Sequence, residues 1–304
     1  MCLRRSVTIV PVFDASSFNL DAYFERIGYD GPRSPDLGTL RAIARAHPLA
    51  IPFENLNPLL RRPVALDLVS LQQKLVGEGR GGYCFEHNLL LGTALTALGY
   101  DVAGLAARVM WNWPPGVVTP RGHMLLLIDL DGPSTSLEAS PSTPLGASRY
   151  IVDAGFGGLT LTGPIKLEAD VEQETPHEPC RLSRDGDMFV MEAKVRNEWK
   201  ALYRFDLQRQ ALPDYEVTNW YLSNHPRSHF VTGLMAARVE SDRRYALRNA
   251  ELAVHYLDGR TERRVLASGA ELRDALERLL RIRVPESPDA NAAFERVIST
   301  VVTT

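Results

Sequence analysis

Apolar side chains recur at helical spacing along the first hundred residues. Four stretches show the pattern: residues 18–30, 36–47, 67–75 and 84–98. Residues that stop helices stand at their ends: Gly28, Pro48, Gly77 with Gly79, and Gly99. Asp67 is placed to cap the third helix. The pattern therefore predicts a small helical bundle.

After residue 100 the pattern changes to short apolar runs separated by Gly, Pro and Asp. Five of these runs are predicted strands: 102–109, 124–130, 150–152, 188–194 and 199–205. Residues 131–149 are rich in Ser, Pro and Thr and are predicted to form a long mobile loop between two strands. The region 101–212 is therefore expected to form a sheet or barrel.

The last part of the chain mixes both patterns. Its predicted elements are a helix near 217–222, strands near 244–249, 252–257 and 261–266, and a helix over 271–281. Asp258-Gly259 is a hairpin turn between the last two strands. The fold class is therefore α+β, with three predicted domains: 1–100, 101–212 and 213–304.

Composition narrows the functional classes. The 304 residues carry a net charge of −3, which excludes a strongly basic nucleic-acid-binding chain and gives no bulk attraction to anionic membranes. The apolar run at 7–12 is too short for a secretory signal, and no stretch approaches the ~18 apolar residues of a membrane span. Three cysteines, Cys2, Cys84 and Cys180, do not make a disulfide framework, so a reducing cytoplasm is expected.

The most unusual segment is GEGRGGYCFEHN, residues 77–88. It contains G-x-G-x-x-G at Gly77, Gly79 and Gly82. A dinucleotide-binding fingerprint needs a preceding strand, whereas LVSLQQKLV before this segment has a helical pattern. GFGG at 155–158 is too short to support that interpretation, so a nucleotide site is disfavoured.

The same segment places Cys84 where a glycine-rich turn enters a helix, and free N–H groups at a helix N-terminus stabilise a thiolate. His123 begins a strand beside Gly122, and Asp153 follows another strand. Imidazole could take the thiol proton, with the carboxylate orienting the imidazole. Each residue also has a structural interpretation: a small buried apolar group, a core histidine and a turn cap. Their order alone is a weak signal.

A metal site is a further alternative. Cys84 and His87 are three residues apart, and His225 and His229 are four apart, which are spacings that zinc ligands use. A structural zinc site normally needs four clustered ligands, and nothing else in the sequence supports these pairs. His225 lies in an Asn-His-Pro turn, where a structural role is expected. No metal is therefore predicted.

Several segments together resemble the arylamine N-acetyltransferase family. RGGYCFEHN at 80–88 is similar to that family's nucleophile motif, R-G-G-x-C-x-E-x-N. Further similar segments are IPFENL (51–56), GHMLLL (122–127), VDAGFG (152–157) and NWYLSNHPRSHF (219–230). The resemblance implies a helical bundle, a central β-barrel and a C-terminal α/β lid. It also implies Cys84, His123 and Asp153 as the catalytic triad.

The resemblance further implies a two-step reaction. The Cys84 thiolate takes the acetyl group from acetyl-CoA, and an arylamine, arylhydroxylamine or hydrazine then takes it from Cys84, with His123 handling the proton. Backbone N–H groups around Tyr83 and Cys84 are candidate donors to the oxyanion. Coenzyme A and the acceptor are the expected partners, without nucleic acid or membrane, and the oligomeric state is left open.

Other matching residues receive supporting roles from the resemblance. Arg80 and Glu54 are expected to pair and to brace the nucleophile turn. Phe53 is expected to line the acceptor pocket; the residues expected to border the coenzyme A entrance are Gly155, Phe156 and Phe230. At each of these positions, ordinary packing or an unrelated surface charge is the alternative.

One departure from the family pattern concerns Gly122, where the family often has Thr or Ser, so a hydrogen bond to the cofactor is in question. Three rival functions stay open. An amide synthase of the same family would share every catalytic residue. A papain- or transglutaminase-like hydrolase would use a similar residue order with different flanking motifs. A catalytically silent binding module is disfavoured by an intact triad.

Overall fold

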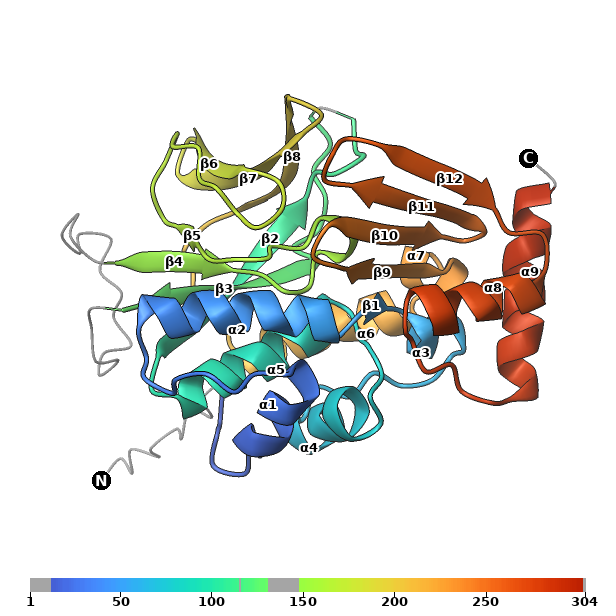
Figure 1. Cartoon of the computed structure of the whole chain (residues 1–304), viewed down its shortest axis with the longest axis horizontal. Coiled ribbons are helices and arrows are strands. Elements are labelled where there is room, and N and C mark those ends of the chain that lie inside the picture. The colour runs from blue at the N-terminus through green and yellow to red at the C-terminus, as the bar shows by residue number, and fades with distance from the viewer. Residues whose placement is uncertain (1–11, 115, 131–147, 303–304) are drawn as a thin grey trace, which may run out of the picture.

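The computed structural model describes residues 12–114, 116–130 and 148–302. Cys2, nearly all of the apolar run at 7–12 and most of the predicted loop at 131–149 lie outside these residues. Figure 1 shows a layer of helices beneath two sheets, with further helices at the C-terminal end. The predicted α+β class, with a helical portion, a barrel-like sheet and a mixed third portion, is confirmed.

The four predicted N-terminal helices are present. They are α1 (Leu20–Ile27), α2 (Leu37–Ala50), α4 (Leu68–Leu71) continued by a π-helical turn (Gln72–Gly77), and α5 (Cys84–Ala97). Asp67 caps α4 by accepting the Ser70 N–H, as predicted. Gly28 ends α1 in the left-handed conformation, with φ +66°. Local capping chemistry thus sets most of these ends.

The predicted stop of the second helix at Pro48 is wrong, because α2 continues to Ala50. Pro48 stands in the last turn, where its missing N–H removes one helical hydrogen bond. The ring is buried, and the Ile51 N–H still reaches the His47 carbonyl. Packing therefore outweighs the local preference against proline.

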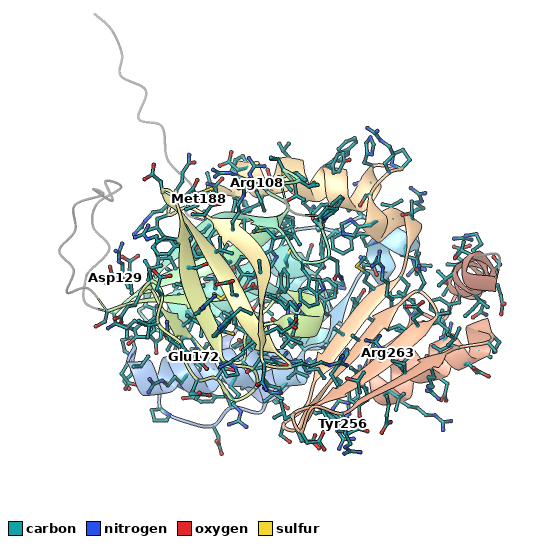
Figure 2. All side chains as sticks on the ribbon, turned by 90° about the horizontal axis from the view of Figure 1, so that it is seen from above. Arg108, Asp129, Glu172, Met188, Tyr256 and Arg263 are labelled. Atoms are coloured by element: carbon teal, nitrogen blue, oxygen red, sulfur yellow. The ribbon has the colours of Figure 1, made fainter. Side chains whose placement is uncertain are left out.

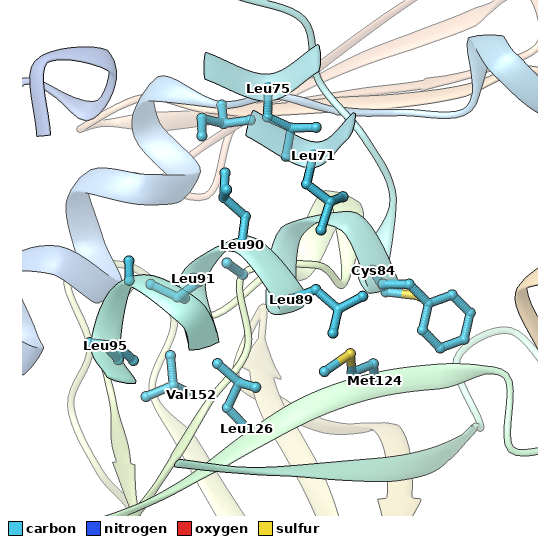
Figure 3. Packing of buried hydrophobic residues seen from close by; sticks show 14 of the residues in the cluster. Leu71, Leu75, Cys84, Leu89, Leu90, Leu91, Leu95, Met124, Leu126 and Val152 are labelled. Carbon is cyan, nitrogen blue, oxygen red and sulfur yellow. The ribbon is translucent and has the colours of Figure 1, made fainter. Parts of the chain in front are cut away.

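Helix α5 is apolar on nearly all sides and lies at the centre of the molecule. Figure 3 shows its residues Leu89, Leu90 and Leu91 between two apolar layers. Those layers contain Leu71 and Leu75 on one side, and Met124, Leu126 and Val152 on the other. A helix that is apolar all round must be enclosed. Its first residue, Cys84, is therefore held between the helices and the barrel.

The central sheet is antiparallel and nearly closes into a barrel. Its strands are β2 (Asp101–Val109), β3 (His123–Asp129), β4 (Arg149–Val152), β5 (Ile165–Lys166), β6 (Cys180–Asp185), β7 (Met188–Val195) and β8 (Glu198–Phe205), in the order β5-β4-β3-β2-β8-β7-β6. Isolated bridges, Ala169 to Leu182 and Gln173 to Cys180, bring the chain after β5 to β6. The five predicted strands are confirmed. Two-residue β5 and the charged edge strand β6 were not predicted.

The third portion contains a second sheet, in the order β1-β9-β10-β11-β12. Its strands are β1 (Phe53–Glu54), β9 (Met235–Val239), β10 (Arg243–Arg248), β11 (Glu251–Tyr256) and β12 (Thr261–Val265). The accompanying helices are α3 (Leu56–Leu59), α6 (Leu212–Asn224), α7 (His229–Thr232), α8 (Gly269–Asp274) continued by a π-helical turn (Ala275–Leu279), and α9 (Pro288–Val302). Figure 2 shows this sheet, with Tyr256 and Arg263, beside the barrel strand that begins at Met188.

The two sheets and the helices share cores across the predicted boundaries. β1, from the first hundred residues, pairs with β9 through Phe53 and Ala237. Tyr215 and Phe230 pack in the core of the N-terminal helices, while Leu56 packs in the core of the third portion. The division at 100 and 212 stays a prediction. None of the helices in the described part of the chain combines the length and the apolar character that crossing a membrane requires.

Candidate active site

Cys84 is the first residue of α5, and backbone contacts fix the turn before it. The Glu54 N–H donates to the Gly82 carbonyl at 2.8 Å, and the Tyr83 N–H donates to Glu86 Oε2 at 3.0 Å. Glycine is required at position 81, because a Cβ there would lie 2.1 Å from the Pro52 carbonyl oxygen. The sulfur is thus presented at a helix N-terminus by a tightly packed turn, and the residue is 3% exposed.

Neighbouring strands bring His123 and Asp153 together. β3 begins at His123, and the antiparallel partner strand β4 ends just before Asp153. His123 Nε2 lies 2.7 Å from Asp153 Oδ2, and both side chains are buried. Asp153 Oδ1 also accepts the Gly155 N–H at 2.8 Å. His123 thus holds one oxygen of the carboxylate and the Gly155 N–H holds the other, which fixes the orientation of the carboxylate toward the imidazole.

Cys84 is close enough to His123 to help raise the pKa of the ring, and its sulfur lies 3.8 Å from the carbonyl oxygen of Gly122, the residue before His123. Burial alone would lower the pKa of His123, but the Asp153 carboxylate and the hydrogen bonds outweigh burial and raise that pKa to about 10. Burial would likewise raise the pKa of Asp153, but the His123 cation and the donors around the carboxylate lower it. The pair is therefore an imidazolium with a carboxylate, and the cation lies beside the sulfur.

Asn88 links the helix of Cys84 to Asp153 and to the strand of His123. It lies one helical turn after Cys84, on the same face of α5. Its Nδ2 donates to Asp153 Oδ1 at 3.1 Å and to the Met124 carbonyl at 2.7 Å. Its Oδ1 accepts the Ala154 N–H at 3.1 Å. In the sequence, Asn88 is the last position of the nucleophile motif, and no role was predicted for it.

Comparisons with known proteins point to one family. A family profile described as N-acetyltransferase matches residues 36–288. The arylamine N-acetyltransferase of Mycolicibacterium smegmatis is 48% identical over 262 residues, covering 86% of this chain and 90% of that protein. The chain belongs to the arylamine N-acetyltransferase family. It is accordingly an acyltransferase.

Further relatives agree with this assignment. The arylamine N-acetyltransferase of Mycobacterium tuberculosis is 42% identical over 283 residues, covering 92% of this chain and 95% of that protein. A solved structure of the Mycobacterium marinum arylamine N-acetyltransferase in complex with CoA superposes with a TM-score of 0.83 at 41% identity. The superposition covers 92% of this chain and 99% of the Mycobacterium marinum chain. The family resemblance expected from the sequence motifs is therefore confirmed.

Behind the nucleophile turn lies a buried cluster of charges. Arg80 Nη2 donates to Glu54 Oε1 at 2.8 Å, so the expected pair forms and is not an unrelated pair of surface charges. Lys74 Nζ lies 2.6 Å from Glu86 Oε1 and 3.8 Å from Glu54 Oε1. Burial would raise the pKa of Glu54, but Lys74 and Arg80 lower it. Lys74 and Glu86 had no predicted role.

We expect Glu54→Gln to destabilise the fold strongly. The change leaves Arg80 buried without its carboxylate, and breaking one partner of a buried pair costs about 3–5 kcal/mol in unfolding free energy. Urea unfolding followed by circular dichroism measures this loss. Glu168→Gln is the control, because Glu168 pairs with Lys166 in the solvent and should show no measurable change. Equal stability of the two variants would contradict the bracing role.

Aromatic rings surround the triad. The Phe156 ring meets the His123 ring edge-on, with centroids 5.2 Å apart. Phe230 contacts the rings of Tyr83 at 5.3 Å and Phe53 at 6.2 Å. The Tyr83 hydroxyl donates to Asn219 on α6. The residues that the resemblance associates with coenzyme A and the acceptor are therefore grouped around Cys84 and His123.

Tyr203 was not predicted to belong to the site. Its ring, on β8, lies 4.9 Å from the His123 ring and 5.1 Å from the Phe156 ring. Burial and the nearby Asp153 carboxylate raise the pKa of its hydroxyl well above the usual value. In the sequence, Tyr203 is one apolar position of an ordinary strand. Its proximity to His123 becomes visible only when the barrel strands are placed together.

One predicted oxyanion donor is unavailable. The Tyr83 N–H is already bonded to Glu86 Oε2, so it cannot also serve a developing oxyanion, and that part of the expectation is wrong. The Cys84 N–H, in the first turn of α5, stays as the candidate donor. The capping carboxylate thus directs any oxyanion toward Cys84 itself.

The nucleotide and metal alternatives find no support in the described residues. Gly77 follows a helix and a π-helical turn, not a strand. Both ring nitrogens of His87 are engaged, with His47 and with the Pro52 carbonyl. Among residues 12–114, 116–130 and 148–302, no three His, Cys, Asp or Glu side chains gather in a geometry for a metal ion.

Two glycines beside the triad differ in the space around them. A Cβ at Gly155 would lie 2.5 Å from the Cys84 Cα and 2.9 Å from Asn88 Nδ2. A Cβ at Gly122 would meet nothing closer than 3.9 Å, although the Gly122 carbonyl lies 3.8 Å from the Cys84 sulfur. Close packing on the nucleophile therefore requires glycine at 155 and not at 122.

We expect Gly155→Ala to lower turnover by about 100-fold or more. The new methyl group would lie 2.5 Å from the Cys84 Cα, so Cys84 must shift relative to His123, and displacements of about 1 Å cost rates of this size. Gly122→Ala is the matched control and should keep activity within about threefold. Steady-state acetylation assays of both variants test this, and a fully active Gly155→Ala variant would contradict it.

Proposed function

We propose that the protein transfers acetyl groups from acetyl-CoA to arylamines, arylhydroxylamines and hydrazines through an acetyl-Cys84 intermediate. The observation that carries the proposal is the geometry around His123. Its Nε2 lies 2.7 Å from the Asp153 carboxylate, its pKa is raised to about 10, and Cys84 is among the groups that raise this pKa. A cation held beside a thiol at a helix N-terminus favours the nucleophilic thiolate.

In the first half-reaction, the Cys84 sulfur attacks the thioester carbonyl carbon. The carbon–sulfur bond to coenzyme A breaks as the bond to Cys84 forms, and the departing thiolate takes the proton from His123. The Cys84 N–H donates to the oxyanion at the helix N-terminus. Asp153 stabilises the imidazolium before the transfer and holds the ring in place through Nε2.

In the second half-reaction, the acceptor nitrogen attacks the acetyl-cysteine. The carbon–sulfur bond to Cys84 breaks, His123 takes the amine proton, and the amide product leaves. The reaction follows a ping-pong order, because coenzyme A departs before the acceptor reacts. Thioester exchange is nearly balanced, whereas the amide is stable, which drives the overall transfer.

The residues around the triad and the solved structure of a relative support the proposed choice of substrates. A relative's solved structure is described as a complex with CoA, which favours acetyl-CoA here. Three residues border the proposed coenzyme A entrance: Gly155, which packs on Cys84, Phe156, which packs on His123, and Phe230, which packs on Tyr83. Phe53, which contacts Phe230, lines the proposed acceptor side. A nucleophilic free thiol also suits a reducing compartment such as the cytoplasm.

Mass spectrometry tests the intermediate directly. Incubation with acetyl-CoA should add one acetyl group at Cys84, and an aromatic amine or hydrazine should then remove it and yield the amide. Cys84→Ala is the control and should show neither acetylation nor turnover. Unmodified Cys84, or undiminished turnover in Cys84→Ala, would disprove the mechanism. Transfer only to an amine tethered in the same acyl chain would indicate an amide synthase instead.

A further inference from the structure

A chain of buried hydrogen bonds lies beneath the nucleophile turn and has no part in the proposed chemistry. The Tyr23 hydroxyl lies 2.9 Å from His47 Nδ1, and His47 Nε2 lies 3.0 Å from His87 Nδ1. His87 Nε2 in turn lies 3.2 Å from the Pro52 carbonyl oxygen. All three side chains are buried. This series of hydrogen bonds therefore joins α1, α2 and α5 to Pro52, the residue before β1.

The Pro52 carbonyl, at one end of this series of hydrogen bonds, determines which atom donates in each of them. The Pro52 oxygen only accepts, so His87 Nε2 carries a hydrogen. Burial lowers the pKa of His87 to about 4, so the ring is neutral and its Nδ1 accepts from His47 Nε2. Burial, then His87 and Arg26, hold the pKa of His47 well below its usual value. His47 Nδ1 therefore accepts from Tyr23, and every polar atom has a partner.

His87 contacts the segment before and within β1 in two ways. Its Nε2 bonds to the Pro52 carbonyl, which also accepts the Gly82 N–H at 3.3 Å. Its ring lies parallel to the Phe53 ring, with the planes 8° apart and the centroids 6.5 Å apart. His87 thus holds one residue by its backbone and the next by its side chain.

Phe53 connects this support to the reacting region. Its ring contacts Phe230, and a Cβ on Gly157 would lie 3.7 Å from it. Gly157 follows Asp153 in the turn after β4, and Phe230 packs on Tyr83, the residue before the nucleophile. The ring is only partly buried. Its orientation against these neighbours therefore depends mainly on the hydrogen bond that holds Pro52, the residue before it, and less on the ring of His87 behind it.

The nucleophile has supports of its own. The Tyr83 N–H is held by Glu86, the Gly82 carbonyl is held by the Glu54 N–H, and Asn88 is held by Asp153. None of these bonds involves His87. Pro52 also contacts the nucleophile turn, through the Gly82 N–H at 3.3 Å. Because the three bonds above hold the turn and Asn88 separately, a change at His87 should displace Pro52 and Phe53 more than it displaces Cys84.

We propose that His87, held in one tautomer by His47, is a positioning residue for the second half-reaction, because it sets the Phe53 wall against which the acceptor ring binds. The inference rests on the proposed ping-pong transfer and assigns a role within it. In a ping-pong scheme, kcat/KM for acetyl-CoA reports the first half-reaction and kcat/KM for the acceptor reports the second. The two half-reactions can therefore be measured separately in one enzyme.

The test compares His87→Asn with His87→Gln, using acetyl-CoA and a simple aromatic amine. A Gln amide reaches about as far as the histidine Nε2 and can still donate to Pro52, whereas an Asn amide reaches only as far as Nδ1. Both variants lose the ring. We expect His87→Asn to lower kcat/KM for the amine about tenfold, the size of one lost buried hydrogen bond. Its kcat/KM for acetyl-CoA should stay within about threefold of the wild type, and His87→Gln should recover most of the amine value.

A purely structural role predicts a different result. Loss of folded enzyme would lower both kcat/KM values by the same factor, and equal falls would overturn the inference, as would no change in either. His47→Asn removes the donor to His87 Nδ1. It should also lower kcat/KM for the amine and not for acetyl-CoA, by a smaller factor. This variant provides the test if His87→Asn does not fold. Absence of acetyl-Cys84 in the wild type would overturn the proposed function and this inference together.

Discussion

Iodoacetamide is expected to alkylate Cys84 at pH 6.5 at least about 10³ times faster than Cys180. The two side chains are equally buried, at 3% and 4% exposed, so accessibility does not separate them. Their neighbouring charges do. Cys84 lies beside the His123 cation at a helix N-terminus, whereas burial and the Glu178 carboxylate raise the pKa of Cys180 to about 12. Cys180 is therefore almost entirely protonated at neutral pH.

Peptide mapping after timed alkylation measures both rates in one sample. Cys180→Ser should leave the Cys84 rate unchanged and so serves as the control. Comparable rates at the two positions would count against an activated thiolate at Cys84. Enzyme activity should fall in step with Cys84 labelling, which links the reactive thiol to turnover.

Asp153→Asn is expected to lower kcat/KM for acetyl-CoA by about 10³–10⁴-fold while the protein stays folded. Changes of this size follow the same substitution in other nucleophile–His–Asp triads. The Asp153 carboxylate is the main group that raises the pKa of His123, and burial alone lowers it. Without the carboxylate the ring is neutral at pH 7, so it cannot support the thiolate or protonate coenzyme A.

The pH profile distinguishes this effect from a general loss of structure. A group whose pKa is raised to about 10 keeps its charge below pH 10 and loses it above. Acetylation of the wild type should therefore be insensitive to His123 ionisation from neutral pH to about 10. In Asp153→Asn, burial alone lowers the pKa of His123, so the rate should already have lost the contribution of the His123 cation at neutral pH and should show no change near pH 10. Asp187→Asn, in the exposed turn between β6 and β7, is the control and should keep the wild-type profile.

Elements with local signals were predicted well from the sequence. α1 ends at Gly28 and α4 begins at its Asp67 cap, because glycine and capping side chains act within a few residues. α9 was not predicted, although its sequence carries an equally clear signal. Its buried residues Ala290, Ala293, Phe294, Val297 and Ile298 follow helical spacing.

Other elements lacked a local signal because their stability comes from distant partners. β1 is only two residues long and exists because Phe53 and Glu54 pair with β9, more than 180 residues away. Pro48 stays helical because its ring is buried, which no local rule predicts. Such elements are decided by tertiary packing, which overrides propensity.

The sequence by itself determined the chemistry that the protein carries. The motif around Cys84, with the segments at His123 and Asp153, identified the family and the three residues that the fold brings together. Those motifs also contain Glu54 and Arg80, whose pairing behind the turn was anticipated. A short motif suffices here because each chemical role needs one residue type at one place in the chain.

Only the tertiary structure decided how that chemistry is tuned. The raised pKa of His123 requires a carboxylate at 2.7 Å inside a closed site, and the sequence separates the two residues by thirty positions. The hydrogen bonds from Tyr23 through His47 to His87 join three helices, and Tyr203 reaches the triad from β8, which β2 separates from the His123 strand. These arrangements depend on burial and on contacts between distant segments, and both arise only when the helices and the barrel pack together.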